Sequence, residues 1–200
     1  MGALMTVDPD FEWPRPPEGG YTSDDLDRLP NLPPHTELID GSLVFVSAQS
    51  NFHTLMLRLL EFELLRQLPD GLDVRREMSV VLGRRNRPEP DLIVIRADAA
   101  GGLNKTAYLP DDVVVAVEVV SPDSEERDRE SKPRKYAAAG IRHFWRVEND
   151  GGRPIVYVYE LDPSTGSYIP AGIYHDKLRL QSPFALDIDL TSLGRRPGLG

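Results

Sequence analysis

The chain contains no cysteine among its 200 residues. Disulfide bonds, thiolate zinc sites and cysteine nucleophiles are therefore excluded, and a chain without thiols is compatible with a reducing cytoplasm. No apolar run reaches the roughly 18 residues of a membrane-spanning helix. The start of the chain also lacks the basic and apolar regions of a signal peptide. We therefore expect a cytoplasmic protein with no membrane partner.

Several widespread enzyme motifs are also missing. The sequence has no GxSxG, no HExxH, no Walker-type glycine loop and no GxGxxG. Aromatic residues make up only 8% of the chain, which gives no indication of the sugar cleft of a glycoside hydrolase, a class that also works with two carboxylates. No helix-turn-helix or zinc-finger pattern for reading bases is recognisable.

The charge is unevenly distributed. The formal net charge of −9 argues, taken alone, against a protein that coats nucleic acid. Residues 75–146, however, hold 14 of the 23 Lys and Arg and 12 of the 32 Asp and Glu, so this segment stands at +2 and the remainder at −11. A near-neutral centre within an acidic chain can still face a polyanion locally.

The length fits one domain with a sizeable core. A start rich in Pro, Gly and Asp predicts a partly mobile N-terminal arm over residues 1–35, then a single domain over residues 36–194 and a frayed tail over residues 195–200. Within the domain, strand and helix patterns alternate. They predict an α/β or α+β fold with a central mixed β-sheet flanked by helices, and further short strands before and after that core.

Hydrophobic periodicity and turn residues place the elements. Asp40-Gly41 is the turn signal of a hairpin, and Gly140 is a natural end for a helix. Because proline fits only the first turn of a helix, Pro133 favours Ser131 as the N-cap of that helix, with a polar loop before it. The expected helices are 22–29, 51–68 and 132–139, and the expected strands are 43–46, 72–82, 91–96, 113–120, 143–148 and 154–161.

One carboxylate, Glu118, lies inside the valine run VVVAVEVV. Such runs build buried strands, and a buried carboxylate is costly unless something pairs with it. Asp91 opens the preceding long strand after Pro90, so two carboxylates can converge if the strands pair. A close carboxylate pair repels itself unless a cation lies between, and Mg²⁺ prefers oxygen ligands of this kind. The alternative is that both carboxylates are ion-paired or lie at the surface, with Arg142 as one candidate partner of Glu118.

Five segments in order resemble the Uma-two family of restriction endonuclease-like proteins, a branch of the PD-(D/E)xK nuclease superfamily. The resemblance runs from about Glu37 to the late SPFALDIDL segment, and so covers most of the chain. It implies a nuclease-like core with metal held at strand ends. The segments are ELIDGSLV, the helix that carries His53, EPDLIVI, VEVVSPDS and DRESKPRKYAAAGIRHFW.

By matching position, Asp91 resembles the metal-binding aspartate of the superfamily and Glu118 its acidic partner. The superfamily normally has a lysine two residues after the glutamate, where this chain has Val120. The family pattern implies a lysine that has migrated to the following helix, and Lys132 is the matching candidate. Lys135 is the alternative.

Further candidates follow from the same resemblance. His53 would approach the metal or a phosphate, Glu77 would supply another carboxylate, and Asp128 would orient the lysine. For His53 a capping or surface role is the competing interpretation, and for Glu77 it is an exposed strand position beside Arg75 and Arg76. Tyr136 and Trp145 also match family positions, where packing is the better interpretation.

The chemistry that the resemblance implies is metal-assisted hydrolysis of phosphodiester bonds in nucleic acid, with DNA as the expected substrate and Mg²⁺ or Mn²⁺ as the cofactor. Asp91, Glu118 and the backbone carbonyl of Val119 would hold the ion, while Lys132 would stabilise the phosphorane or position the attacking water. A homodimer would suit cleavage of both strands. Nucleic-acid contacts are expected from Arg84, Arg85 and Arg87.

A second hypothesis is a nuclease-fold protein that binds nucleic acid or a protein partner without cleaving. Val120 in place of the usual lysine and the acidic net charge favour it. Asp91 and Glu118 favour the enzyme, because a binding module has no need of a buried glutamate on that strand.

Overall fold

The computed structural model describes residues 15–193. The first 14 residues of the predicted arm and the predicted tail, 195–200, lie outside the described residues, and the division into arm and domain stays a prediction. Within the described part of the arm, Tyr21 and Ser23 are buried. The backbone N–H of Ser23 donates to the carbonyl of Arg84 at 2.8 Å. Within residues 15–193 no helix is long and apolar enough to cross a membrane.

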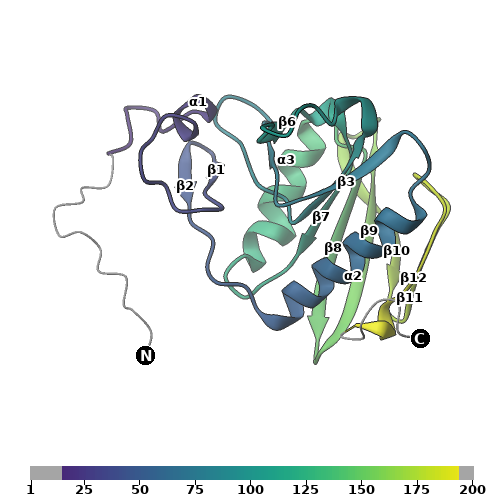
Figure 1. Cartoon of the computed structure of the whole chain (residues 1–200). Coiled ribbons are helices and arrows are strands. Elements are labelled where there is room, and N and C mark those ends of the chain that lie inside the picture. Colours follow the sequence, from purple (N-terminus) through teal and green to yellow (C-terminus); the bar gives the residue numbers. More distant parts are fainter. Residues whose placement is uncertain (1–14, 194–200) are drawn as a thin grey trace.

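The elements follow the expected alternation (Figure 1). Short 3₁₀ turns lie at Ala97–Ala99, Pro110–Asp112 and Leu190–Ser192, and a π-helical turn at Arg127–Ser131. The helices are α1 (Ser23–Leu26), α2 (Asn51–Gln67) and α3 (Lys132–Ala138), and the strands are β1 (Glu37–Ile39), β2 (Ser42–Val44), β3 (Leu72–Arg76), β4 (Ser79–Val80), β5 (Leu92–Arg96), β6 (Ala107–Tyr108), β7 (Val113–Val119), β8 (His143–Asp150), β9 (Arg153–Asp162), β10 (Ser167–Tyr174), β11 (Lys177–Leu180) and β12 (Leu186–Asp189).

A six-stranded sheet in the order β10-β9-β8-β7-β5-β3 forms the centre of the molecule. Only β7 and β8 pair in parallel, and every other neighbouring pair in this sheet is antiparallel. The predicted central mixed sheet is therefore confirmed. The additional short strands form a β1-β2 hairpin, a β4-β6 pair and a β11-β12 pair beside it.

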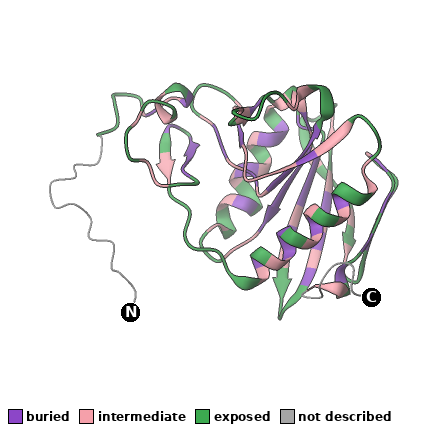
Figure 2. Cartoon of the chain, viewed as in Figure 1, coloured by how far each residue is buried: buried purple, intermediate pink, exposed green. Residues whose placement is uncertain are grey.

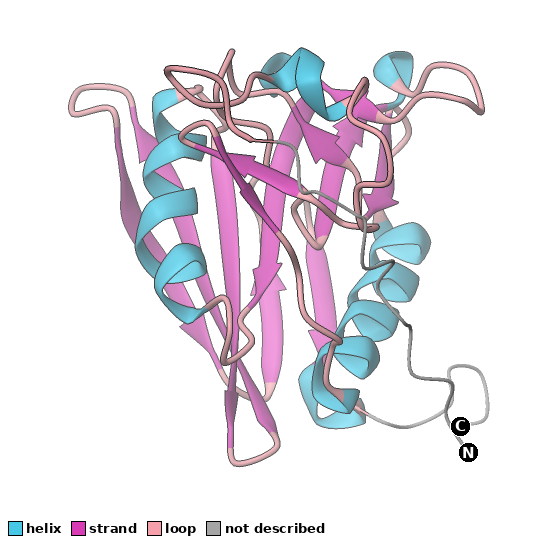
Figure 3. Ribbon diagram, turned by 90° about the vertical axis from the view of Figure 1, so that its left-hand side faces the viewer, coloured by secondary structure: helices cyan, strands magenta, loops and turns pink. Residues whose placement is uncertain are grey.

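Helices cover both faces of this sheet, as Figure 3 shows. On one face α2 buries Met56, Leu57, Leu60 and Leu64, whose spacing places them along one side of the helix. On the other face Tyr136 of α3 packs in a second apolar cluster. Strand β7 is covered on both sides, which explains its nearly continuous valine sequence (Figure 2).

The β1-β2 hairpin has the predicted turn. Asp40 and Gly41 both have positive φ, at 52° and 80°, which is the turn geometry that an Asp-Gly pair favours. Strand β2 ends at Val44, however, and Val46 lies beyond it, exposed.

The predicted strand over residues 72–82 is wrong, because the chain turns at Glu77. This residue has φ 52° and separates β3 from β4. Strand β4 then leaves the central sheet and pairs in parallel with β6. The turn brings the Glu77 N–H to the carbonyl of Asp91 at 3.1 Å.

The predicted start of the last helix at a Ser131 cap is also wrong. Ser131 has helical φ and ψ, and the helical backbone begins several residues earlier. The Lys132 N–H donates to the carbonyl of Arg127, five residues back, which defines a π-helical turn. This wider turn accommodates Pro133 inside a continuous helical segment, where an α-helical turn would clash with its ring.

Candidate functional site

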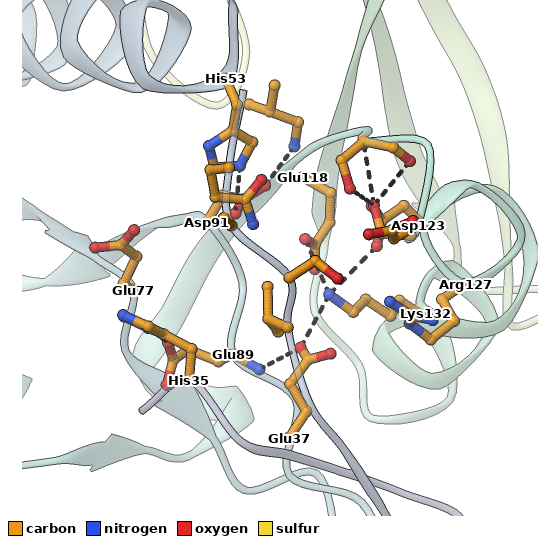
Figure 4. A pocket seen from close by; sticks show the side chains of 18 of the residues that line it. His35, Glu37, His53, Glu77, Glu89, Asp91, Glu118, Asp123, Arg127 and Lys132 are labelled. Atoms are coloured by element: carbon orange, nitrogen blue, oxygen red, sulfur yellow. Dashed lines mark hydrogen bonds and ion pairs between the residues drawn. The ribbon is translucent and has the colours of Figure 1, made fainter. Parts of the chain in front are cut away.

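A cavity of about 450 Å³ opens where β5 begins and the antiparallel β7 ends, between the start of α2 and the helical segment that contains the π-helical turn (Figure 4). Its lining is rich in ionisable side chains from segments far apart in the sequence. The lining residues are Pro33, Pro34, His35, Glu37, Val46, Ser47, Ala48, Gln49, His53, Glu77, Glu89, Asp91, Glu118, Val119, Ser121, Asp123, Ser124, Arg127, Asp128 and Lys132.

Lys132 is the central cation of this cavity. It is buried, and its Nζ lies 3.1 Å from Oε2 of Glu118, 2.9 Å from Oε1 of Glu37 and 3.3 Å from Oδ1 of Asp128. All three carboxylates are buried as well. One ammonium group therefore faces three carboxylates that come from β1, β7 and the π-helical turn.

Glu118 is held at both of its oxygens. Oε2 accepts a hydrogen bond from Lys132, and Oε1 accepts a 2.5 Å hydrogen bond from the hydroxyl of Tyr136. Burial and the nearby Glu118 raise the pKa of Tyr136 well above its ordinary value, so this phenol stays neutral and donates. Packing therefore describes only part of the role of Tyr136, whereas Trp145 packs against Phe184 in the core as expected.

Asp91 is held next to this cluster by two different groups. Its Oδ1 lies 2.9 Å from Nε2 of His53, and its Oδ2 accepts a 2.6 Å hydrogen bond from the backbone N–H of Val119. His53 lies in the first turn of α2, where the side chain of Ser50 caps the helix by accepting the His53 N–H. The sheet register and the cap of α2 thus fix the carboxylate of Asp91.

Burial and an excess of carboxylates together set the electrostatics of the cluster. Burial raises the pKa of Glu118 well above its ordinary value; Lys132 opposes this shift, while Asp128, Asp91 and Glu37 reinforce it. Burial also raises the pKa of Asp128. Burial alone would lower the pKa of Lys132, but the carboxylates, Glu118 first, raise it well above its ordinary value. In all three groups the neighbouring carboxylates raise the pKa, so the cluster favours additional positive charge.

A second pair lies on the opposite wall of the cavity. Nδ1 of His35 is 2.5 Å from Oε1 of Glu89, and this hydrogen bond raises the pKa of His35. The pKa of Glu89 is itself raised by burial. Glu77, also in the lining, pairs with Arg76 at 3.3 Å. His35 and Glu77 both have positive φ, at 59° and 52°, a backbone strain that is often stored at functional sites.

Other predicted residues lie outside the cluster. Val120 borders a separate shallow cavity. Lys135, the alternative lysine, pairs with Asp40 at 2.6 Å and does not reach Glu118. Glu118 does have a basic partner, but it is Lys132 rather than Arg142, which is exposed.

The three arginines predicted to contact nucleic acid differ in exposure. Arg84 and Arg85 are exposed, and Arg85 donates to the backbone carbonyl of Asp40. Arg87 is buried, and its guanidinium bonds to the carbonyl of Ser23 and to Asp27. The prediction for Arg87 is therefore wrong, because its charge is used to hold the segment around α1.

Within residues 15–193 no three His, Asp or Glu side chains are arranged as a preformed metal site. Both oxygens of Asp91 and both of Glu118 have protein hydrogen-bond partners. A carboxylate offers about four lone-pair positions, so each of these groups retains acceptor capacity.

Sequence reasoning missed five ionisable residues of the cavity: His35, Glu37, Glu89, Asp123 and Arg127. Glu37 opens the strand ELI, whose two apolar residues are too short a run to give the buried-strand signal that identified Glu118. No comparable signal marked Arg127 or His35, because each lies in an irregular polar stretch of the sequence.

Comparisons with known proteins agree with this architecture. A family model, Uma2, described as "Putative restriction endonuclease", matches residues 23–192. A solved structure described as a "putative nuclease belonging to DUF820" from Anabaena variabilis ATCC 29413 superposes with a TM-score of 0.67 at 17% sequence identity. The match covers 86% of this chain and 96% of that chain. At this identity the likeness shows a shared fold. No curated protein matches the chain.

Proposed function

The chain belongs to the Uma2 family, and we propose that it is a metal-dependent endonuclease that hydrolyses phosphodiester bonds, with DNA as its substrate. One observation carries this proposal. Asp91 and Glu118 lie at the ends of adjacent strands, and the lysine that is missing at Val120 is replaced by Lys132, whose Nζ lies 3.1 Å from Glu118. The superfamily's trio of side-chain types is thus present in one cavity, with the lysine supplied by a helix.

The donor chemistry of the cavity fits a hard divalent cation. The ammonium group of Lys132 is attracted electrostatically by four carboxylates, which raise its pKa. They belong to Glu37, Asp91, Glu118 and Asp128. Oxygen donors of this kind are the ligands that Mg²⁺ and Mn²⁺ prefer. Asp91 and Glu118, together with the backbone carbonyl of Val119, would hold the ion. When bound, the ion supplies charge neutralisation at the phosphoryl group and acidifies a water molecule.

Lys132 has the charge and the position to act on the substrate. Three carboxylates keep its ammonium group charged and fix it at the wall of the cavity. A fixed cation that loses no energy to reorganisation stabilises the charge that develops on an attacked phosphate. The same group can instead hold the attacking water by a hydrogen bond. Asp128, 3.3 Å from Nζ, and Glu37 are positioning residues for this lysine.

His53 and Tyr136 orient the two acids that would bind the ion. His53 contacts Oδ1 of Asp91, and Tyr136 donates to Oε1 of Glu118. Partners of metal-binding carboxylates fix their direction, which is commonly as important for affinity as the ligands themselves.

Metal binding and cleavage together test the proposal. Calorimetry with Mn²⁺ and Mg²⁺ would be run on the native chain, on Asp91→Asn and on Glu118→Gln, and nicking of supercoiled plasmid would be scored in the same buffers. Asp111→Asn, which removes one exposed carboxylate outside the cavity, is the matched control. We expect binding and nicking in the native chain and the control, and the loss of both in the two cavity variants.

The alternative function is a nuclease-fold protein that binds nucleic acid or a protein without cleaving it. The observation that favours it is the engagement of every oxygen of Asp91 and Glu118 by protein groups. Metal binding without nicking would support this alternative. The absence of metal binding would return Glu118 to the role of a buried structural charge paired with Lys132.

A further inference from the structure

We propose that Arg127 is the residue that binds a phosphate group of the substrate in the cavity. This inference rests on the proposed function and adds the anion-binding group of that site. Arg127 lines the cavity at the start of the π-helical turn. It is partly buried, and its Nε is shielded from solvent without a hydrogen-bond partner.

The rest of the guanidinium of Arg127 also lacks a partner. Within residues 15–193 no hydrogen bond or ion pair of this side chain is formed, and every other described arginine without such a contact is exposed. Arg76 and Arg87 provide the comparison, since each also has a buried Nε without a hydrogen bond. Their guanidinium groups, however, are paired, with Glu77 and with Asp27 respectively.

An unpartnered arginine at this depth has a physical cost. A guanidinium carries five N–H donors; the one on Nε of Arg127 is withdrawn from water without a partner, and such a donor destabilises a fold. The folded chain tolerates this cost where an external ligand completes the bonding. Only an acceptor can do so, and an anion does it best, because charge-assisted hydrogen bonds are the strongest of this class.

The cavity determines which anion fits. Seven carboxylates line it: Glu37, Glu77, Glu89, Asp91, Glu118, Asp123 and Asp128. An incoming phosphodiester meets their repulsion unless positive groups face it. Lys132 already forms ion pairs with three of these carboxylates. Arg127 is the other Lys or Arg in the lining, and its planar fork matches two non-bridging phosphate oxygens.

The π-helical turn explains how Arg127 comes to lie beside Lys132. Its carbonyl accepts the Lys132 N–H, five residues ahead. A wider turn places side chains four and five residues apart on one side, so Arg127, Asp128 and Lys132 all line the cavity. Figure 4 shows Arg127 on the same wall as Lys132, opposite His35, with no interaction to the other residues drawn.

Two kinds of probe test this assignment. Binding of a fluorescein-labelled DNA duplex would be followed by anisotropy at several salt concentrations, with Ca²⁺ in place of Mg²⁺. Separately, the unfolding temperature would be measured as inorganic phosphate replaces chloride at constant ionic strength. The proteins are the native chain, Arg127→Gln, Arg127→Lys and Asp91→Asn. Arg58→Gln is the charge-matched control, because Arg58 is exposed on α2 and forms no ion pair with any described residue.

For Arg127→Gln we expect DNA affinity to fall about 5- to 30-fold and the salt slope to fall by about 1, as for the loss of one phosphate contact. Arg127→Lys should recover part of the affinity, and Arg58→Gln should match the native chain. Phosphate should raise the unfolding temperature of the native chain and of Arg58→Gln but not that of Arg127→Gln. Because Arg127 has no bond to lose, its variants should fold like the native chain.

The outcomes separate this inference from the proposed function. Equal DNA affinity, salt slope and phosphate response in Arg127→Gln and the native chain would overturn the role of Arg127, even if Asp91→Asn abolishes nicking. A native chain that neither binds nor nicks DNA would contradict the proposed function. If, in that chain, phosphate still raises the unfolding temperature and Arg127→Gln removes this rise, Arg127 forms an anion site. If phosphate does not raise the unfolding temperature, the inference about Arg127 is overturned together with the proposed function.

Discussion

Lys132 and Glu118 form a buried ion pair, with Nζ 3.1 Å from Oε2, between a helical segment and the end of a central strand. The lysine also contacts Glu37 and Asp128, so the pair is the centre of a cluster with more acid than base. The hydroxyl of Tyr136 donates a hydrogen bond to Oε1, the other carboxylate oxygen of Glu118. This relationship brings Lys132 next to Glu118 in the cavity, whereas Val120, two residues after Glu118, is not among the lining residues.

Lys132→Met is expected to lower the free energy of unfolding by about 3–5 kcal/mol, because it leaves buried carboxylates without their counter-charge. Urea denaturation would measure the change, with Lys177→Met as the control, because Lys177 is exposed and has no ion pair in the described part of the chain. If Lys132→Met unfolds at the same urea concentration as the native chain, then the cluster is not held together as described.

Tyr136→Phe removes a single hydroxyl that donates to Glu118 at 2.5 Å. Loss of a buried hydrogen bond to a charged acceptor should cost about 1–3 kcal/mol of stability. Tyr157→Phe removes a hydroxyl that forms no hydrogen bond within residues 15–193, and it should have little effect. Thermal unfolding of both variants tests this, and equal unfolding temperatures would contradict the importance of the hydroxyl.

The stability of the metal-free chain should depend on pH through Glu118. Burial raises the pKa of this carboxyl in the folded state, so the folded chain binds a proton that the unfolded chain has already released. Stability should therefore fall as pH rises above about 4, the region of the unfolded pKa, until the folded pKa is passed. Glu118→Gln cannot ionise and should lose less stability over the same interval.

Denaturation in EDTA at a series of pH values would check this difference. The free energy of unfolding of Glu118→Gln, relative to the native chain, is expected to increase with pH. The opposite result would be a free energy of unfolding of Glu118→Gln that decreases with pH relative to that of the native chain. It would mean that Lys132 stabilises the ionised Glu118 by more than burial destabilises it.

His53→Ala removes the side chain 2.9 Å from Oδ1 of Asp91. Loss of such an orienting partner typically reduces metal affinity 10- to 100-fold, and a drop of about that size is expected for Mn²⁺. His53→Gln, which keeps a donor near the same place, should recover part of the affinity, and the exposed His175→Ala should have none of this effect. Calorimetry would decide, and an unchanged Mn²⁺ affinity in His53→Ala would exclude a role in orienting Asp91.

Much of the fold could be predicted because its signals are local. Each signal predicts the structure of its own segment from nearby residues alone. The leucine spacing predicts the helix over residues 51–67, Asp40-Gly41 predicts the hairpin turn, and the valine run around Glu118 predicts a buried strand. The family resemblance proposed from those segments, the mixed sheet and the flanking helices are confirmed.

The wrong predictions concern positions whose structure depends on a partner far away in the sequence or on an unusual backbone conformation. Pro133 indicated a helix start, but the π-helical turn lets the helix continue through it, which a propensity argument cannot foresee. The burial of Arg87 depends on Asp27, 60 positions away. Glu37 was missed because three residues of strand give too short a pattern, although its burial matches that of Glu118.

The most direct test of the account is the location of Mn²⁺ by anomalous diffraction from crystals of the native chain. The expected result is a peak within coordination distance of the carboxylates of Asp91 and Glu118, and no peak there in crystals of Glu118→Gln. A cavity that takes up no Mn²⁺ at saturating concentration, or an ion bound elsewhere while plasmid nicking continues, would contradict it.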